Sequence, residues 1–199
     1  MQTTTETNAT PKSSGPASAD FSGFMRQRHR PLCRLYKQDP KAAWVADSAR
    51  TSDAASLSDD PIHGELIIGD TTLEPHRAPL AIHSAVGGDH DGPNPGDYLA
   101  AALAACFDRT ARIIANRLGI NIESLTVAVK AEVDVRGTLC IDPDVPVQFQ
   151  RLTLTSRMQL DDAVPEAMRS ALVTAAEHSC VVMQTLRGGV EVVTKHETA

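Results

Sequence analysis

Two of the four cysteines, Cys106 and Cys180, are the residues best suited to do chemistry. A thiolate is a nucleophile, and it can be oxidised to a sulfenic acid or joined in a disulfide. Both cysteines lie in segments predicted to be helical, and they are far apart in the sequence, so only the tertiary fold can bring them together. A free cysteine more often packs in an apolar core. Thiol chemistry and simple packing therefore both fit the pattern.

The helix that carries Cys106 is predicted to span residues 95–118 and to be the buried, central helix of the fold. Asn94 is a suitable N-cap, Asp97 completes a capping box, and Gly119 follows the last turn. The stripe expected to face the core comprises Leu99, Leu103, Cys106, Thr110, Ile113 and Arg117. Because a helix dipole acts mainly within the first turn, a reactive Cys106 needs a cation from elsewhere in the fold.

The remaining patterns predict an α+β fold with antiparallel sheets around this helix. Strands are predicted at 42–46, 64–68 and 80–85 as a meander, and at 125–136 and 147–160 as a hairpin with a bulge near 150. A short helix is predicted at 31–38 with Leu32, Leu35 and Tyr36 facing inward. A second helical region is predicted from Pro165 through Cys180 to Gly188-Gly189, and a closing strand at 190–193. The alanine-lined central helix and the apolar hairpin favour a homodimer.

Composition limits the classes of partner. The chain has 199 residues and a net charge of −6, which argues against nucleic acid. Residues 1–25 are predicted to be a disordered tail, and 26–199 a single domain. Scattered cysteines without a CxxC pair favour a reducing interior, so we expect a cytoplasmic protein. No apolar run is long enough to cross a bilayer, so no membrane partner is expected. The basic cluster at 26–30 is interpreted as a solvated segment.

A metal-dependent activity is the weakest alternative. Asp89, His90 and Asp91 lie in a glycine- and proline-rich loop before the central helix. Three such residues in one loop do not complete a coordination shell. We therefore expect no metal and no organic cofactor.

Two segments resemble the OsmC/Ohr family of organic hydroperoxide resistance proteins. They are the stretch from Gly92 to Cys106, followed by a strand ending in Asp134-Val135-Arg136-Gly137, and the segment Ala175-Ala176-Glu177-His178-Ser179-Cys180. The resemblance covers roughly residues 42–193. It implies an OsmC-like fold in an intertwined homodimer, and an enzyme that reduces organic hydroperoxides to alcohols with an external dithiol.

The resemblance also implies roles for individual residues. Cys106 would be the peroxidatic thiolate and Cys180 the resolving thiol, with no cofactor. Arg50 matches by position the arginine that activates the thiolate, and Asp97 is either its carboxylate partner or only a helix cap. The sequence departs from the family pattern at Gly96, where relatives carry Glu, and at Val181, where Pro is frequent. The alternative function is a non-enzymatic dimer that binds a small apolar ligand at the subunit interface.

Overall fold

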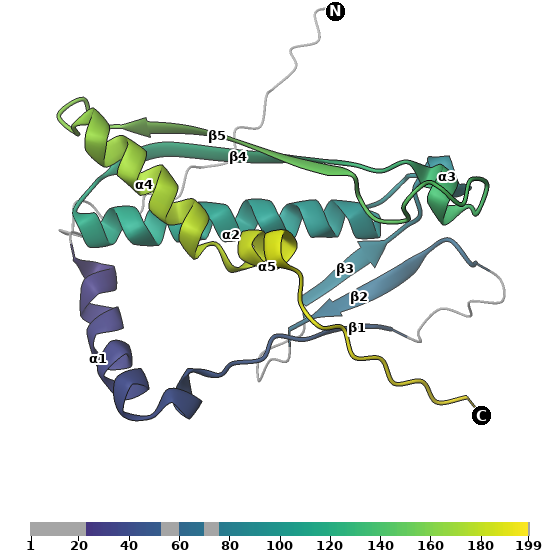
Figure 1. Cartoon of the computed structure of the whole chain (residues 1–199), viewed down its shortest axis with the longest axis horizontal. Coiled ribbons are helices and arrows are strands. Elements are labelled where there is room, and N and C mark those ends of the chain that lie inside the picture. Colours follow the sequence, from purple (N-terminus) through teal and green to yellow (C-terminus); the bar gives the residue numbers. More distant parts are fainter. Residues whose placement is uncertain (1–22, 53–59, 70–75, 199) are drawn as a thin grey trace, which may run out of the picture.

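The computed structural model describes residues 23–52, 60–69 and 76–198, and the α+β prediction is confirmed (Figure 1). A three-stranded antiparallel sheet and a two-stranded hairpin accompany one long central helix. The described elements are α1 (Phe24–Gln38), the 3₁₀ turn η1 (Pro40–Ala43), β1 (Ala49–Thr51), β2 (Gly64–Ile68), β3 (His76–Leu80), the 3₁₀ turn η2 (Ser84–Val86), α2 (Pro95–Leu118), β4 (Ile122–Glu132), α3 (Val135–Thr138), β5 (Arg151–Leu160), α4 (Glu166–Ser179) and α5 (Val181–Gly188).

The central helix α2 has the predicted bounds and caps. The Asn94 side-chain oxygen accepts hydrogen bonds from the amides of Gly96 at 2.8 Å and Asp97 at 3.3 Å. The Asp97 carboxylate accepts in return from the Asn94 amide at 3.0 Å, which completes the capping box. Gly119 ends the helix with φ 74°, a conformation that glycine adopts without steric cost.

The stripe of α2 that faces the core differs from the predicted one. Its buried residues are Leu103, Phe107, Ala111 and Ala115, one at every fourth position. β4, α4 and α5 pack against α2 and determine which of its faces is buried. The sequence of the helix alone did not define this face, because apolar residues occur on more than one side. Cys106 is only partly buried at the border of the stripe, and Ala101, Ala102 and Ala105 are exposed.

The hairpin prediction is confirmed, with different strand ends. β4 and β5 pair from Ile122 with Leu160 to Glu132 with Arg151, and the register irregularity lies at Ile122 and Ser124. The prediction of a bulge near residue 150 is therefore wrong. The alternation of apolar and polar residues changes there because β5 begins at Arg151. Residues 133–136 do not extend β4, because Asp134 caps the short helix α3.

The three-stranded meander is confirmed in its order, β1-β2-β3, but two of its strands are displaced. Residues 42–46 form no strand: Asp39 caps the turn η1, and Trp44 follows it with 87% of its surface exposed. The strand expected at 80–85 ends at Leu80, since the chain enters η2. Residues 53–59, between β1 and β2, lie outside the described residues, as do residues 1–22 of the tail expected at 1–25.

Three other predictions at the ends of the chain are wrong. α1 begins seven residues earlier than expected, and its Leu32 and Leu35 face solvent. The second helical region is interrupted at Cys180, which separates α4 from α5. Residues 190–193 form no strand, and their three valines are 65–79% exposed.

A histidine joins the start of β2 to the loop that leads into α2. The Nδ1 of His63 lies 2.8 Å from an Asp60 oxygen, and its Nε2 lies 3.0 Å from an Asp91 oxygen. Both ring nitrogens donate only in the imidazolium form. The hydrogen bond to Asp60, followed by that to Asp91, raises the pKa of His63 above its usual range.

We expect the contribution of His63 to stability to be largest in acid. A raised pKa in the folded state means that this contribution is fully present below the ordinary histidine value of about 6.5 and is lost as the pH rises through the folded pKa. The melting temperature of the wild type should fall from pH 6 to pH 8 relative to that of His63→Gln. His76→Gln, on the exposed start of β3, is the control. Parallel melting profiles for wild type and His63→Gln would contradict the expectation.

Candidate functional site: two cysteines between α2 and α5

The fold brings the two predicted cysteines together. Cys106 lies about three turns into α2, and Cys180 lies between α4 and α5, where both helices pack against α2 (Figure 1). Cys106 packs against the buried cluster that contains Cys180, and it is close enough to raise the pKa of the Cys180 thiol. Cys180 is completely buried, whereas Cys106 is partly exposed. A reagent from solvent would therefore meet Cys106 first.

Burial determines the protonation state of Cys180. It raises the pKa of this thiol above its ordinary value, and the neighbouring Cys106 adds to the increase. The amides of Met183 and Val182, at the start of α5, oppose the shift without reversing it. Cys180 consequently carries its proton at neutral pH and can donate it when its sulfur reacts.

Apolar side chains surround the two sulfurs. Leu103, Phe107, Ala111, Ala176 and Met183 form one buried cluster with Cys180. The partly buried residues packed against this cluster are Cys106, Ile114, Leu125, Val127, Val129, Leu152, Leu154, Met158 and Val182. The setting favours an uncharged, apolar reaction partner, because ionised groups are costly to place among such residues.

Arg50 lies away from the region in which α2, α4 and α5 pack together. It is exposed on β1, and it pairs in register with Ile67 of β2, which in turn pairs with Arg77 of β3. Side chains at paired positions share one face of a sheet, so Arg50 and Arg77 flank the buried Ile67. Arg77 is bound to Glu65. Arg50 has no ion pair within the described part of the chain.

Sequence reasoning overlooked a charged group two residues after Cys106 in α2. Asp108 binds Arg109 and Arg112 of the same helix, with 3.0 Å from Arg112 Nε to the carboxylate. Burial of Asp108 opposes ionisation, but the two guanidinium groups hold the pKa of the carboxyl below its usual range. The i,i+4 spacing of Asp108 and Arg112 was the available signal. Both arginines closest in sequence after Cys106 are thus engaged by Asp108.

Asp97 acts at the start of α2. Its carboxylate accepts from both the main-chain amide and, at 2.6 Å, the side-chain amide of Asn94. Gly96, where relatives carry Glu, lies close to two side chains. A Cβ at this position would lie 3.0 Å from both Asn94 Oδ1 and Phe149 Cζ.

The metal alternative does not involve the cysteines, and neither does a shallow surface pocket on α4. Among the described residues, no three histidine, cysteine or acidic side chains are arranged to hold a metal ion. Asp91 binds His63, and His90 packs edge-on against His83.

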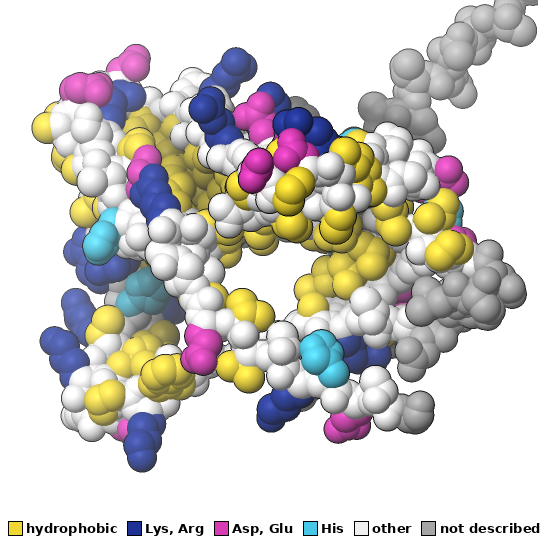
Figure 2. Space-filling model, turned by 45° about the vertical axis from the view of Figure 1, so that its right-hand side comes forward, with side chains coloured by type: hydrophobic (Ala, Val, Ile, Leu, Met, Phe, Trp, Pro, Cys, Tyr) yellow, Lys and Arg dark blue, Asp and Glu magenta, His cyan; other side chains and the backbone are white. Residues whose placement is uncertain are grey.

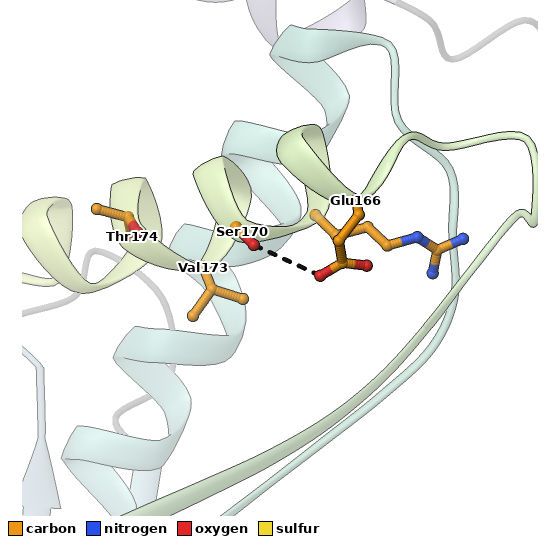
Figure 3. Close-up of a pocket in the computed structure, with 5 residues that line it drawn as sticks. Glu166, Ser170, Val173 and Thr174 are labelled. Carbon is orange, nitrogen blue, oxygen red and sulfur yellow. Dashed lines mark hydrogen bonds between the residues drawn. The ribbon is translucent and has the colours of Figure 1, made fainter.

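A shallow pocket of about 360 Å³ lies along one face of α4 (Figure 3). Its residues are Glu166, Arg169, Ser170, Val173 and Thr174.

The sequence model of the OsmC-like protein family matches residues 88–195, which include both cysteines and the helices that carry them. The chain belongs to the OsmC-like family. A search of curated proteins gave no match. The OsmC-like assignment therefore rests on the family model and on the fold.

Solved structures share the OsmC-like fold at low sequence identity. An OsmC-like protein of unknown function from Vibrio cholerae is 13% identical, with a TM-score of 0.55. The alignment covers 71% of this chain and 94% of the Vibrio chain. An organic hydroperoxide resistance protein OsmC from Legionella pneumophila is 22% identical with a TM-score of 0.51, covering 75% and 94%. An organic hydroperoxide resistance protein from Elizabethkingia anophelis is 18% identical, with a TM-score of 0.53. The alignment covers 75% of this chain and 93% of that one.

Proposed function

We propose that this OsmC-like protein is a thiol-dependent peroxidase that reduces organic hydroperoxides to alcohols. The observation that carries the proposal is the contact between the thiols of Cys106 and Cys180, one partly exposed and one buried. The names of the Legionella and Elizabethkingia structures, both organic hydroperoxide resistance proteins, support the substrate class. The apolar surroundings of the sulfurs favour a peroxide with an apolar organic group.

The reaction proceeds in three steps. The Cys106 thiolate attacks the terminal peroxide oxygen, the O–O bond breaks, and the alkoxide takes a proton and leaves as an alcohol. Cys106 is then a sulfenic acid. The Cys180 sulfur attacks it, a disulfide forms, and the hydroxyl leaves as water with the proton of the Cys180 thiol. An external dithiol supplies two electrons and two protons and restores both thiols.

The functional unit is proposed to be a homodimer. Ala101, Ala102 and Ala105 leave one face of α2 exposed and free of bulky side chains. Figure 2 shows an opening through the molecule with hydrophobic side chains along its upper and right-hand edges. A second subunit would cover these exposed apolar surfaces. The mass of the protein in solution tests this arrangement.

Arg50 is the cation that we propose for activating Cys106. Because β1 lies away from the cysteines within one subunit, this role requires that Arg50 reach the site in the proposed homodimer. A guanidinium stays charged at any physiological pH and donates to both a thiolate and a peroxide oxygen. Arg50→Ala should lower the rate of Cys106 oxidation by roughly 10²-fold, as expected for loss of an electrostatic contact in the transition state. The matched control is Arg77→Ala, which removes the arginine on the other side of Ile67. Equal losses in the two variants would remove Arg50 from the mechanism.

The overall proposal is tested with the reduced protein, tert-butyl or cumene hydroperoxide, and a dithiol. We expect consumption of the peroxide with one alcohol formed per dithiol oxidised. Without dithiol, one equivalent of peroxide should lower the protein mass by about 2 Da as the disulfide forms. A protein that consumes no peroxide would instead support the alternative function, binding of a small apolar ligand between subunits.

A further inference from the structure

The first helix is the most basic part of an acidic chain. Five cations, Arg26, Arg28, Arg30, Arg34 and Lys37, lie in the fifteen residues of α1 (Phe24–Gln38), which contain no acidic residue. Without these five charges, the net charge of −6 becomes −11 for the rest of the chain. Such a separation of charge is typical of a segment that meets an anionic partner.

The helix has two distinct faces. Phe24, Leu32 and Leu35 recur at intervals of eight and three residues and therefore share one stripe. Arg26, Arg30, Arg34 and Lys37 follow the same periodicity on the opposite side. Arg28 lies within the apolar stripe, four residues after Phe24, and its guanidinium lies 4.8 Å from the centre of the Phe24 ring.

The apolar stripe is open to solvent along the length of α1. Phe24, Leu32 and Leu35 are 41–45% exposed, and no residue of α1 is buried. The helix is fixed to the body at its first turn, where the Met25 amide donates to Asn116 Oδ1 at 2.8 Å and Arg26 donates to the Arg117 carbonyl. The remainder projects away from α2 (Figure 1). Figure 2 shows hydrophobic and basic side chains together at the lower left, where α1 lies.

An aromatic residue extends this surface. Trp44 follows η1, which packs against α1, and it is 87% exposed, with Val45 beside it 82% exposed. Tryptophan and phenylalanine are favoured at the boundary between lipid and water. Helices with a Lys/Arg-rich face and a Phe/Leu stripe lie in this boundary with the apolar side down.

We propose that α1 and Trp44 form a docking surface for an anionic lipid bilayer. Phe24, Leu32 and Leu35 enter the boundary of the acyl chains, while Arg30, Arg34 and Lys37 bind the headgroups. Lipid is favoured over nucleic acid because phosphate contacts alone leave the apolar stripe exposed. This binding differs from crossing a membrane: no helix among the described residues is long and apolar enough to do that. The inference revises the expectation that the protein has no membrane partner.

The test is flotation of the full-length protein with vesicles of phosphatidylcholine alone or with about 30% phosphatidylserine, which supplies the negative surface charge of a cytoplasmic leaflet. We expect binding to the anionic vesicles only. Trp44 is the single tryptophan of the chain, so its emission reports directly on this surface. It should shift to the blue on binding and be quenched by brominated acyl chains.

Two paired variants separate the contributions. Arg30→Gln with Arg34→Gln should weaken binding by about tenfold or more, as should Leu32→Gln with Leu35→Gln. The matched control, Arg151→Gln with Arg157→Gln, removes two exposed charges from β5 and should bind like the wild type. Unchanged melting temperatures show that the variants fold.

Other outcomes would overturn the inference. Equal binding to both vesicle types, or none to either, would exclude an anionic bilayer. Loss of self-association by the leucine variant without lipid would assign the stripe to a second copy of the chain. Binding to duplex DNA that requires the arginines but not the leucines would assign the helix to nucleic acid.

Discussion

Cys106→Ser is expected to lower peroxide turnover by about 10³-fold or more, since the alcohol of serine replaces the thiolate that attacks the peroxide. Cys180→Ser should behave differently. It should reduce a single equivalent of peroxide and then stop, with Cys106 held as a sulfenic acid that adds roughly 16 Da for one oxygen. Mass spectrometry and a dimedone-type probe of sulfenic acids measure these two outcomes.

The other two cysteines provide the controls for this experiment. Cys33 on α1 and Cys140 after α3 are both exposed free thiols. Cys33→Ser and Cys140→Ser should retain the turnover of the wild type. If Cys106→Ser still consumed peroxide at the rate of the wild type, the proposed chemistry would be wrong even though the family assignment would stand.

Phe107→Ala should produce the largest loss of stability of any single change near the site. The ring is 1% exposed and packs in the cluster that contains Cys180. Removing a buried phenylalanine typically costs about 3–5 kcal/mol, through lost burial and the cavity that remains. Denaturation with urea should show a lower midpoint and an unchanged slope.

Leu118→Ala, at the end of the same helix, is the comparison for Phe107→Ala. Leu118 is 48% exposed, so its removal should cost less than about 1 kcal/mol. If Phe107→Ala lost no more stability than Leu118→Ala, the cluster around Cys180 would not be the core of the domain.

The bounds of α2 were predictable because its caps are local. Asn94, Asp97 and Gly119 determine both ends through hydrogen bonds and backbone conformations within a few residues of each end. The pairing of β4 with β5 was predictable for a related reason, since a regular alternation continues on both sides of one turn. In both cases the information lies in consecutive residues.

The errors fall where a distant partner decides the structure. Trp44 and Val45 have high strand propensity, but no neighbouring strand pairs with them in the described residues, so propensity alone misplaced the first strand. The same holds for Val192 and Val193. The break at Cys180 had no glycine or proline signal, because Val181 follows it directly. The contact between Cys106 and Cys180 was implied by the family resemblance and not by spacing.

The break at Cys180 determines how far an oxidised sulfur would disturb its surroundings. The residue has φ −76° and ψ 103°, and its carbonyl accepts from the Gln184 amide at 2.9 Å. Rotation about the two backbone bonds of this single residue moves the sulfur and tilts α5, while the internal hydrogen bonds of α4 stay intact. The Gln184 side chain donates to the Glu177 carbonyl at 2.8 Å and Arg187 pairs with Glu177, so these two ties between α5 and α4 would resist such a tilt. We expect the oxidised state to break them before it disturbs α4.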